Sequence, residues 1–199
     1  MAYLARVADR ELVAALAAAG IVLLEGPRGC GKTSTGLQAA ASAALLDRDE
    51  AERALAAVAP ERVLVGAQPR LVDEWQLVPS LWNQARAMVD ALGAPKGQFI
   101  FAGSSVPADD VTRHTGALRV HRLRMRPMSL TESGGSSREV SLAAVLAGDH
   151  PLAPSRRTDL ATLTDHVVRG GWPGLIGVGS DAAQGVLRST VDDIARVDA

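Results

Sequence analysis

Residues 26–33 read Gly-Pro-Arg-Gly-Cys-Gly-Lys-Thr, and they follow an apolar run, Ile-Val-Leu-Leu, at residues 21–24. The segment fits the spacing G-x-x-x-x-G-K-[ST] at every fixed position. Glycines at this spacing let successive backbone N–H groups point inward at the oxygens of an anion, because no Cβ opposes the required conformations. The residues after the segment are rich in Ala, Leu and Gln without proline, which predicts a helix whose positive N-terminal end adds to the site. The order strand, loop, helix therefore predicts a loop that binds nucleotide phosphates.

The whole loop and the first residue after it are candidate nucleotide-binding residues: Gly26, Pro27, Arg28, Gly29, Cys30, Gly31, Lys32, Thr33 and Ser34. Lys32 is expected to reach the β- and γ-phosphates and is also a candidate catalytic residue, while Thr33 is expected to bind Mg²⁺. For Cys30, a residue tolerated at a variable loop position is the favoured interpretation, and a redox role is the alternative.

Composition narrows the class of protein. A chain of 199 residues suits one α/β domain with at most a small appendage. Its 21 basic and 22 acidic residues nearly cancel, so overall charge gives no reason to expect a nucleic-acid or membrane partner. The single cysteine excludes an internal disulfide, and we find neither a secretory signal nor a long apolar span. These features favour a cytoplasmic protein.

Along the whole chain, predicted strands alternate with predicted helices. Strands are expected at residues 43–46, 70–73, 99–102 and 118–126, and helices at residues 1–19, 49–58 and 79–92. In the first helix, Leu4, Val7, Leu12, Val13 and Leu16 are predicted to face the protein and Arg6 to face water. The alternation predicts an α/β fold of the P-loop NTPase type, with a mostly parallel sheet covered by helices on both faces.

The C-terminal part is predicted to be a small helical segment. We expect the core at residues 1–132, a flexible Ser-Gly-rich connector at 133–138 and helices within 139–199. That last stretch is interpreted either as a lid or as the start of a truncated second domain.

A second acidic motif, Leu71-Val72-Asp73-Glu74, ends an apolar strand in two carboxylates. Asp73 is expected to hold Mg²⁺ through water, and Glu74 to polarise the water that attacks the γ-phosphate. The alternative is that Glu74 only caps the following turn. Ser104, which follows the strand at 99–102, is a candidate for contacting the γ-phosphate, and an ordinary turn serine is its alternative.

Five motifs in order carry a family resemblance: GPRGCGKT, PRLVDEWQ, FIFAGSS, RHTGALRVHRLRMRPMSLTESG and RGGWPG. Together they resemble the AAA-type ATP-binding domain of a large family of bacterial and archaeal ATPases. The resemblance implies ATP and Mg²⁺ as ligands. It also implies a further C-terminal domain, for which a nuclease-like character is one interpretation, that this chain is expected to lack. It also makes Arg119 the leading candidate for an arginine that contacts the γ-phosphate, in its own subunit or in a neighbouring one, with Arg113 second.

Several interpretations stay open. Arg122, Arg124 and Arg126 could track the phosphates of a nucleic acid, but a charged edge strand is favoured. Trp75, Trp82 and Trp172 are interpreted as packing residues. The leading function is a Mg²⁺-dependent ATPase that controls a partner or an attached domain and that could form a homo-oligomer. The alternatives are a nucleotide-gated binding module without turnover and, less favoured, a small-molecule kinase, since an acidic pair that activates water is wasteful in a kinase.

Overall fold

The computed structural model describes residues 2–103, 119–153 and 158–197, and the chain forms two compact units, Met1–Arg126 and Pro127–Ala199. The sequence predicts a core that ends at residue 132. The structure ends it at Arg126 because the last strand of the sheet stops at Arg124 and Pro127, which has no N–H to donate, follows soon after. The stretch 133–138 contains neither helix nor strand and lies within the second unit.

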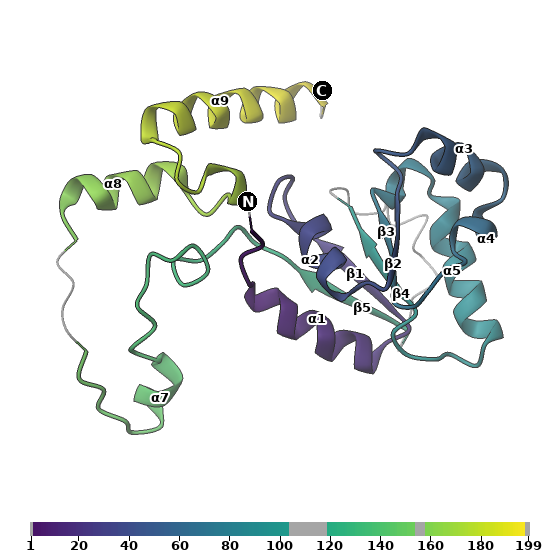
Figure 1. The fold of residues 1–199 in the computed structure, drawn as a ribbon, viewed down its shortest axis with the longest axis horizontal. Coiled ribbons are helices and arrows are strands. Elements are labelled where there is room, and N and C mark those ends of the chain that lie inside the picture. Colours follow the sequence, from purple (N-terminus) through teal and green to yellow (C-terminus); the bar gives the residue numbers. More distant parts are fainter. Residues whose placement is uncertain (1, 104–118, 154–157, 198–199) are drawn as a thin grey trace. The chain divides into compact units, whose positions relative to one another are not determined.

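The first unit is built on a five-stranded sheet in the order β2-β3-β4-β1-β5 (Figure 1). Every neighbouring pair of strands is parallel. The strands are β1 (Ile21–Glu25), β2 (Ser42–Leu45), β3 (Arg70–Asp73), β4 (Phe99–Ala102) and β5 (Val120–Arg124). The predicted parallel α/β sheet is thereby confirmed, and each predicted strand is found within about two residues of its expected position.

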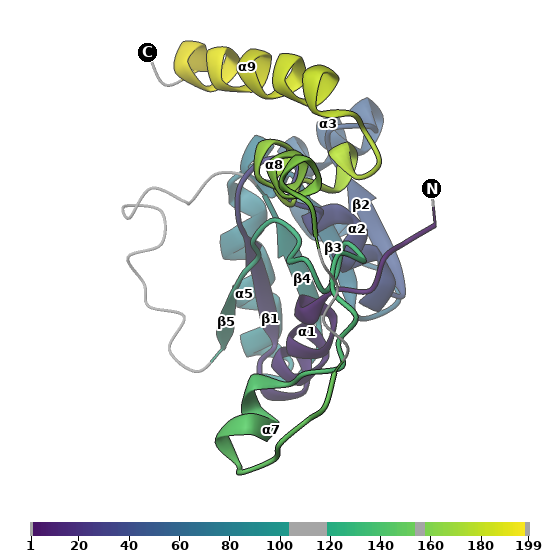
Figure 2. The ribbon, with the colours of Figure 1, turned by 90° about the vertical axis from the view of Figure 1, so that its left-hand side faces the viewer.

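Helices cover both faces of this sheet, as Figure 2 shows with α5 on one side and α1 and α2 on the other. The helices of the first unit are α1 (Val7–Ala18), α2 (Lys32–Ala39), α3 (Glu50–Val58), α4 (Pro60–Val63) and α5 (Ser80–Ala91), with a 3₁₀ turn, η1, at Trp75–Leu77. Side chains alternate across the strands. Ile21, Leu23, Val72, Phe99 and Phe101 share one core cluster with buried residues of α3, α4 and α5.

The aromatic centre of that cluster joins η1 to α5. Trp75 and Trp82 stack with ring centroids 5.3 Å apart, and the edge of Phe101 meets both rings at 6.0 and 5.5 Å. Trp75 is 1% exposed and Trp82 is 3% exposed. Their predicted role in packing is confirmed. On the opposite face of β3, Leu71 touches α2 so closely that a Cβ on Gly36 would lie 2.8 Å from it.

The first helix begins at Val7, later than expected, and it buries Leu12 and Leu16 as predicted but not the other apolar residues expected on its inner face. Ala8, Leu12, Ala15 and Leu16 are its buried residues, at the spacing of one helical stripe. The predictions for Val7 and Val13 were wrong, since both are about half or more exposed. Arg6, predicted to face water, is 8% exposed because its side chain turns back toward the sheet, as described below.

The second unit contains α7 (Leu142–Leu146), α8 (Leu160–Arg169), a 3₁₀ turn, η2 (Pro173–Leu175), and α9 (Ser180–Val197). The Gly-Gly-Trp-Pro-Gly motif makes a backbone contact within it, because the N–H of Met128 donates to the carbonyl of Gly171 at 2.6 Å. A Cβ on Gly171 would lie 1.9 Å from the Met128 carbonyl oxygen. Glycine is therefore required where this motif meets the start of the unit.

In the ranges that the structure describes, none of the helices is both long and apolar enough to span a bilayer.

Candidate nucleotide-binding site

The parallel sheet brings the two motifs to one edge. The loop follows the last residue of β1, Glu25, and the acidic pair comes at the end of β3. β4 lies between these strands, with Ala102 level with Leu24 on one side and with Asp73 on the other. Because neighbouring strands are about 4.8 Å apart, the loop begins roughly 10 Å from Asp73 along this edge. The carboxyl ends of parallel strands are the usual place for a ligand in an open α/β sheet.

The loop conformation depends on glycine at two points. At Gly26, φ is +154° and a Cβ would lie 2.4 Å from the carbonyl oxygen of Met125. At Gly31, φ is +103° and ψ is 19°, a left-handed conformation in the residue that caps α2. These conformations seat the loop against the end of β5 and start α2 directly behind it (Figure 1).

Lys32 is buried and folds back over the loop. Its Nζ donates to the carbonyl oxygens of Gly26 at 2.9 Å and Pro27 at 3.1 Å, and the residue is 7% exposed. An ammonium group carries three donors, so these two carbonyls occupy part of its capacity. The positive charge is thus held against the start of the loop, and its contact with phosphates stays a prediction.

Thr33 and Asp73, the two residues predicted to bind the metal, are in direct contact. The Thr33 hydroxyl donates to Asp73 Oδ2 at 2.8 Å, and Asp73 is 2% exposed. Burial raises the pKa of the Asp73 carboxyl above its ordinary value; the Thr33 hydrogen bond opposes the rise, and the charge of Glu74 adds to it. A buried carboxylate beside a hydroxyl offers hard oxygen ligands, and its charge favours a divalent cation.

Glu74 lies next to Asp73 but turns away from the strand. Its φ and ψ are 50° and 40°, so it is a non-glycine residue in the left-handed region. Such a conformation costs about 1 to 2 kcal/mol in a residue with a Cβ. The Glu74 carboxylate accepts a hydrogen bond from Gln76 Nε2. Gln76 thus holds the Glu74 carboxylate in the turn that follows β3.

Gln76 was not singled out from the sequence, although it ends the PRLVDEWQ motif. Its Oε1 and the indole Nε1 of Trp75 are buried without a hydrogen-bond partner among the described residues. Both atoms lie close to Gly103, where a Cβ would be 2.2 Å from the first and 3.1 Å from the second. Unpaired polar atoms are therefore found beside Glu74, at the carboxyl end of β4.

Two other predicted residues fall outside the described part of the chain. Ser104 and Arg113 belong to the segment 104–118, so their predicted roles stay predictions.

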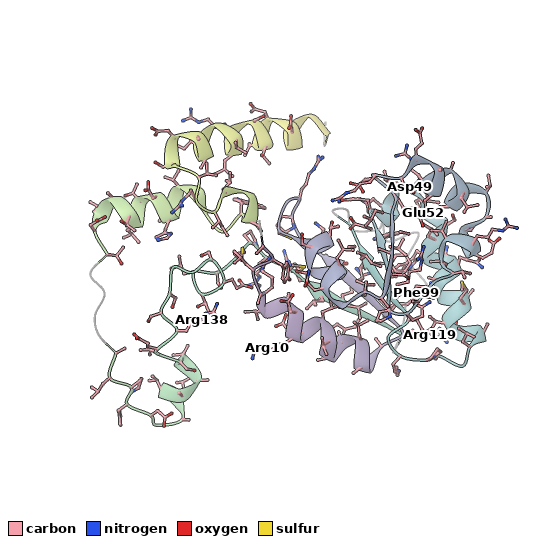
Figure 3. All side chains as sticks on the ribbon, in the orientation of Figure 1. Arg10, Asp49, Glu52, Phe99, Arg119 and Arg138 are labelled. Atoms are coloured by element: carbon pink, nitrogen blue, oxygen red, sulfur yellow. The ribbon has the colours of Figure 1, made fainter. Side chains whose placement is uncertain are left out.

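Arg119 is described, and the structure does not bring it to the loop. It precedes β5, whose first residue pairs with Ile21 at the start of β1, whereas the loop follows the far end of β1. A strand of about five residues is roughly 16 Å long. Arg119, labelled in Figure 3, pairs instead with Asp90 of α5 at 2.7 Å, and its carbonyl accepts from the N–H of Ile21, the first residue of β1, at 3.0 Å. A contact with phosphate in its own subunit is contradicted by this placement, which leaves the role toward a neighbouring subunit as a prediction.

The basic strand β5 is the last strand of the sheet. Leu123 and Met125 are buried, while Arg122 and Arg124 are exposed and Arg122 pairs with Glu25. This is the arrangement expected of a charged edge strand.

Two residues near the N-terminus contact the loop and α2, which the sequence did not indicate. Arg6 donates from its guanidinium to the carbonyl of Cys30 at 2.8 Å. The Tyr3 hydroxyl lies 3.0 Å from Thr35 Oγ1 and donates to Asp9 at 2.5 Å. Neither residue lies in a recognisable motif. Cys30 itself is fully buried, unlike the partly exposed cysteines that carry redox chemistry.

The fold and the loop define a nucleotide-binding domain of the P-loop ATPase type. The chain belongs to the AAA domain family, whose model matches residues 18–134, more than half of its length. A crystal structure of the FIGL-1 AAA domain in complex with ADP is similar to the chain, with 16% identity and a TM-score of 0.46, covering 97% of this chain and 75% of that one. No curated protein matches the sequence.

Proposed function

We propose that this domain binds Mg-ATP and hydrolyses it, and that the nucleotide state controls a partner or an attached domain. The observation that carries the proposal is the 2.8 Å hydrogen bond between Thr33 and Asp73. It joins the metal-binding position of the loop to that of β3, two residues that lie 40 positions apart in the sequence. Family membership and the seating of the loop on the sheet support the same conclusion.

In this proposal each residue has a distinct part. The backbone N–H groups of the loop and Lys32 bind the β- and γ-phosphates. Glu74 accepts a proton from the attacking water, with Gln76 fixing the orientation of its carboxylate. Thr33 and Asp73 would hold Mg²⁺, which when bound neutralises charge on the phosphate oxygens. Ser104 is proposed to contact the γ-phosphate. The base, the cation and the phosphates would then meet at one edge of the sheet.

The position of Arg119 supports a second candidate function. Since it lies at the other end of β5, the proposed γ-phosphate arginine would have to come from another subunit. A single copy would then bind nucleotide without turning it over. We therefore keep a nucleotide-gated binding module as the alternative, with turnover conditional on self-assembly.

Phosphate release and nucleotide binding, measured over a range of protein concentrations, separate these functions. Wild type is compared with Glu74→Gln, which keeps the size of the side chain but removes the base, and with Lys32→Ala, which removes the phosphate-binding cation. If the domain is an ATPase, wild type releases phosphate in proportion to the amount of protein. The Glu74→Gln variant should bind nucleotide as well as wild type does, and the Lys32→Ala variant should bind it weakly. Arg10 is exposed on α1, so the Arg10→Gln variant serves as the control for loss of a charge.

A specific activity that rises with protein concentration indicates assembly, and Arg119→Gln should then abolish the rise. Nucleotide binding without release at any concentration favours the gated module. Absence of binding by the wild type, with Lys32→Ala indistinguishable from it, would refute both functions.

A further inference from the structure

Arg6 is a buried cation whose side chain contacts the phosphate loop. It lies directly before α1, and only 8% of its surface is exposed. One Nη of its guanidinium donates to the carbonyl of Cys30 and the other to the carbonyl of Arg126, both at 2.8 Å. The side chain therefore bridges the loop and the end of the first unit, which closes at Arg126. A buried guanidinium is costly unless such donors are satisfied, so its placement is specific.

The carbonyl that Arg6 binds belongs to the peptide between Cys30 and Gly31. In a trans peptide the C=O and the N–H point in opposite directions. When Arg6 holds the Cys30 oxygen toward β5, the N–H of Gly31 points the other way, into the loop. Gly31 caps α2 and precedes Lys32. The N–H groups at the start of that helix are the donors that a phosphate would meet.

The segment that carries Arg6 is itself fixed at two points. The backbone N–H of Arg6 donates to Asp9 Oδ2 at 2.7 Å. Tyr3, earlier in the same segment, donates its hydroxyl to Asp9 Oδ1 and lies 3.0 Å from the Thr35 hydroxyl on α2. Burial, with the Asp9 hydrogen bond second, raises the pKa of Tyr3 to about 12, so this phenol stays protonated as a donor. The guanidinium is held in place before any nucleotide arrives.

We propose that Arg6 is a positioning residue for nucleotide binding, because it orients the Cys30–Gly31 peptide so that the Gly31 N–H faces the phosphates. The inference rests on the proposed function as a nucleotide-binding ATPase. It adds a residue that lies outside the loop and both acidic motifs. The guanidinium acts through the loop and does not touch the nucleotide.

The test uses Arg6→Gln and Arg6→Lys in the full chain, with Mg-ADP as the probe. Lysine keeps the charge and the aliphatic stem but cannot reach two carbonyls with a planar fork. Loss of a hydrogen bond from a charged donor corresponds to roughly ten- to hundredfold weaker binding. Arg10→Gln is the matched control, since Arg10 is exposed on α1, four residues after Arg6, and Figure 3 shows its side chain directed away from the fold. We expect Arg10→Gln to bind Mg-ADP with the wild-type affinity.

The chain offers a readout that a merely structural role would not change. It contains one cysteine, so labelling cysteine carbonyl carbon and glycine nitrogen gives a single NMR correlation from the Cys30–Gly31 peptide. In the wild type, Mg-ADP should move the Gly31 amide proton downfield. In both Arg6 variants the Cys30 carbonyl should shift before ligand is added, and the response of the amide to Mg-ADP should be largely lost.

The outcomes separate the proposals. Arg6 variants that bind Mg-ADP within about twofold of the wild type and keep its correlation would overturn the role of Arg6 alone. Variants that do not fold would also overturn it, because Arg6 would then be needed for the structure itself. A wild type that binds no nucleotide refutes the proposed function, and this inference falls with it.

Discussion

Replacing Thr33 by valine should measure how much the Thr33 hydroxyl stabilises the buried Asp73 carboxylate. Valine has nearly the same shape, so the change removes the donor at 2.8 Å from Asp73 Oδ2 and little else. A hydrogen bond to a charged group contributes about 1.5 to 3 kcal/mol, and Asp73 is 2% exposed, so water cannot easily replace the donor. At neutral pH, without nucleotide, we expect Thr33→Val to lower the free energy of unfolding by about 2 kcal/mol.

The pH dependence of this loss follows from the same contact. The Thr33 bond opposes the rise in the Asp73 pKa that burial causes, so its removal should raise that pKa further. Once Asp73 is protonated, the lost bond is one between neutral groups and contributes about 0.5 to 1.5 kcal/mol. The difference between variant and wild type should therefore shrink as the pH falls through the pKa of folded Asp73.

Urea unfolding, followed by the fluorescence of the buried Trp75 and Trp82, measures these free energies. A double-mutant cycle with Asp73→Asn isolates the pair, since Thr33→Val should cost only about 1 kcal/mol when residue 73 is neutral. A loss below about 0.5 kcal/mol at neutral pH, together with no coupling in the cycle, would show that the hydroxyl does not stabilise the carboxylate.

Three further predictions concern single residues of the first unit. The pKa of Asp73 in the folded protein lies above its ordinary value of 3.8, so the contribution of Asp73 to stability is complete below pH 3.8 and is lost as the pH rises through the folded-state pKa. At neutral pH without Mg²⁺, the Asp73→Asn variant should therefore unfold at a higher urea concentration than wild type. An equal or lower urea midpoint would contradict this. Tyr3 is the only tyrosine, so an ultraviolet titration of phenolate should show one transition near pH 12; a midpoint near 10 would mean that Tyr3 is not held against Asp9. Glu74→Gly should be more stable than Glu74→Ala by about 1 kcal/mol, because glycine adopts the left-handed conformation without the steric cost; equal urea midpoints would place residue 74 in an ordinary conformation.

The sequence predicted the parts of the fold that depend on local pattern. The apolar runs of β1 and β4 are buried on both faces, so their composition alone marks them as strands, and Leu71-Val72 gives a shorter apolar signal in β3. The loop motif and the Asp73-Glu74 pair fix their own places, because each directly follows such a strand. Parallel strands then bring them to the same edge, which is why Thr33 and Asp73 could be expected to approach each other.

The remaining features depend on tertiary contacts that leave no local signature. Arg6 is charged and lies near the start of a helix, where an exposed position is the ordinary expectation. Only the arrival of the loop and of the end of β5 at the same place provides carbonyls for its donors. The position of Arg119 was open for a related reason: the motif shows its neighbours in the sequence, but only the parallel register of β5 puts it at the end of the sheet opposite the loop of its own subunit.

The buried thiol of Cys30, a residue of the phosphate loop, can report how often that loop opens. Its sulfur is fully covered, and a Cβ on Gly26 would lie 3.2 Å from it, so a thiol reagent can reach it only when the loop leaves its seat. The chain has no other cysteine, and no engineered label is needed. The rate at which the thiol is alkylated therefore measures how often the loop opens, in the same way that amide exchange measures local unfolding. Any ligand that closes the loop should slow that reaction.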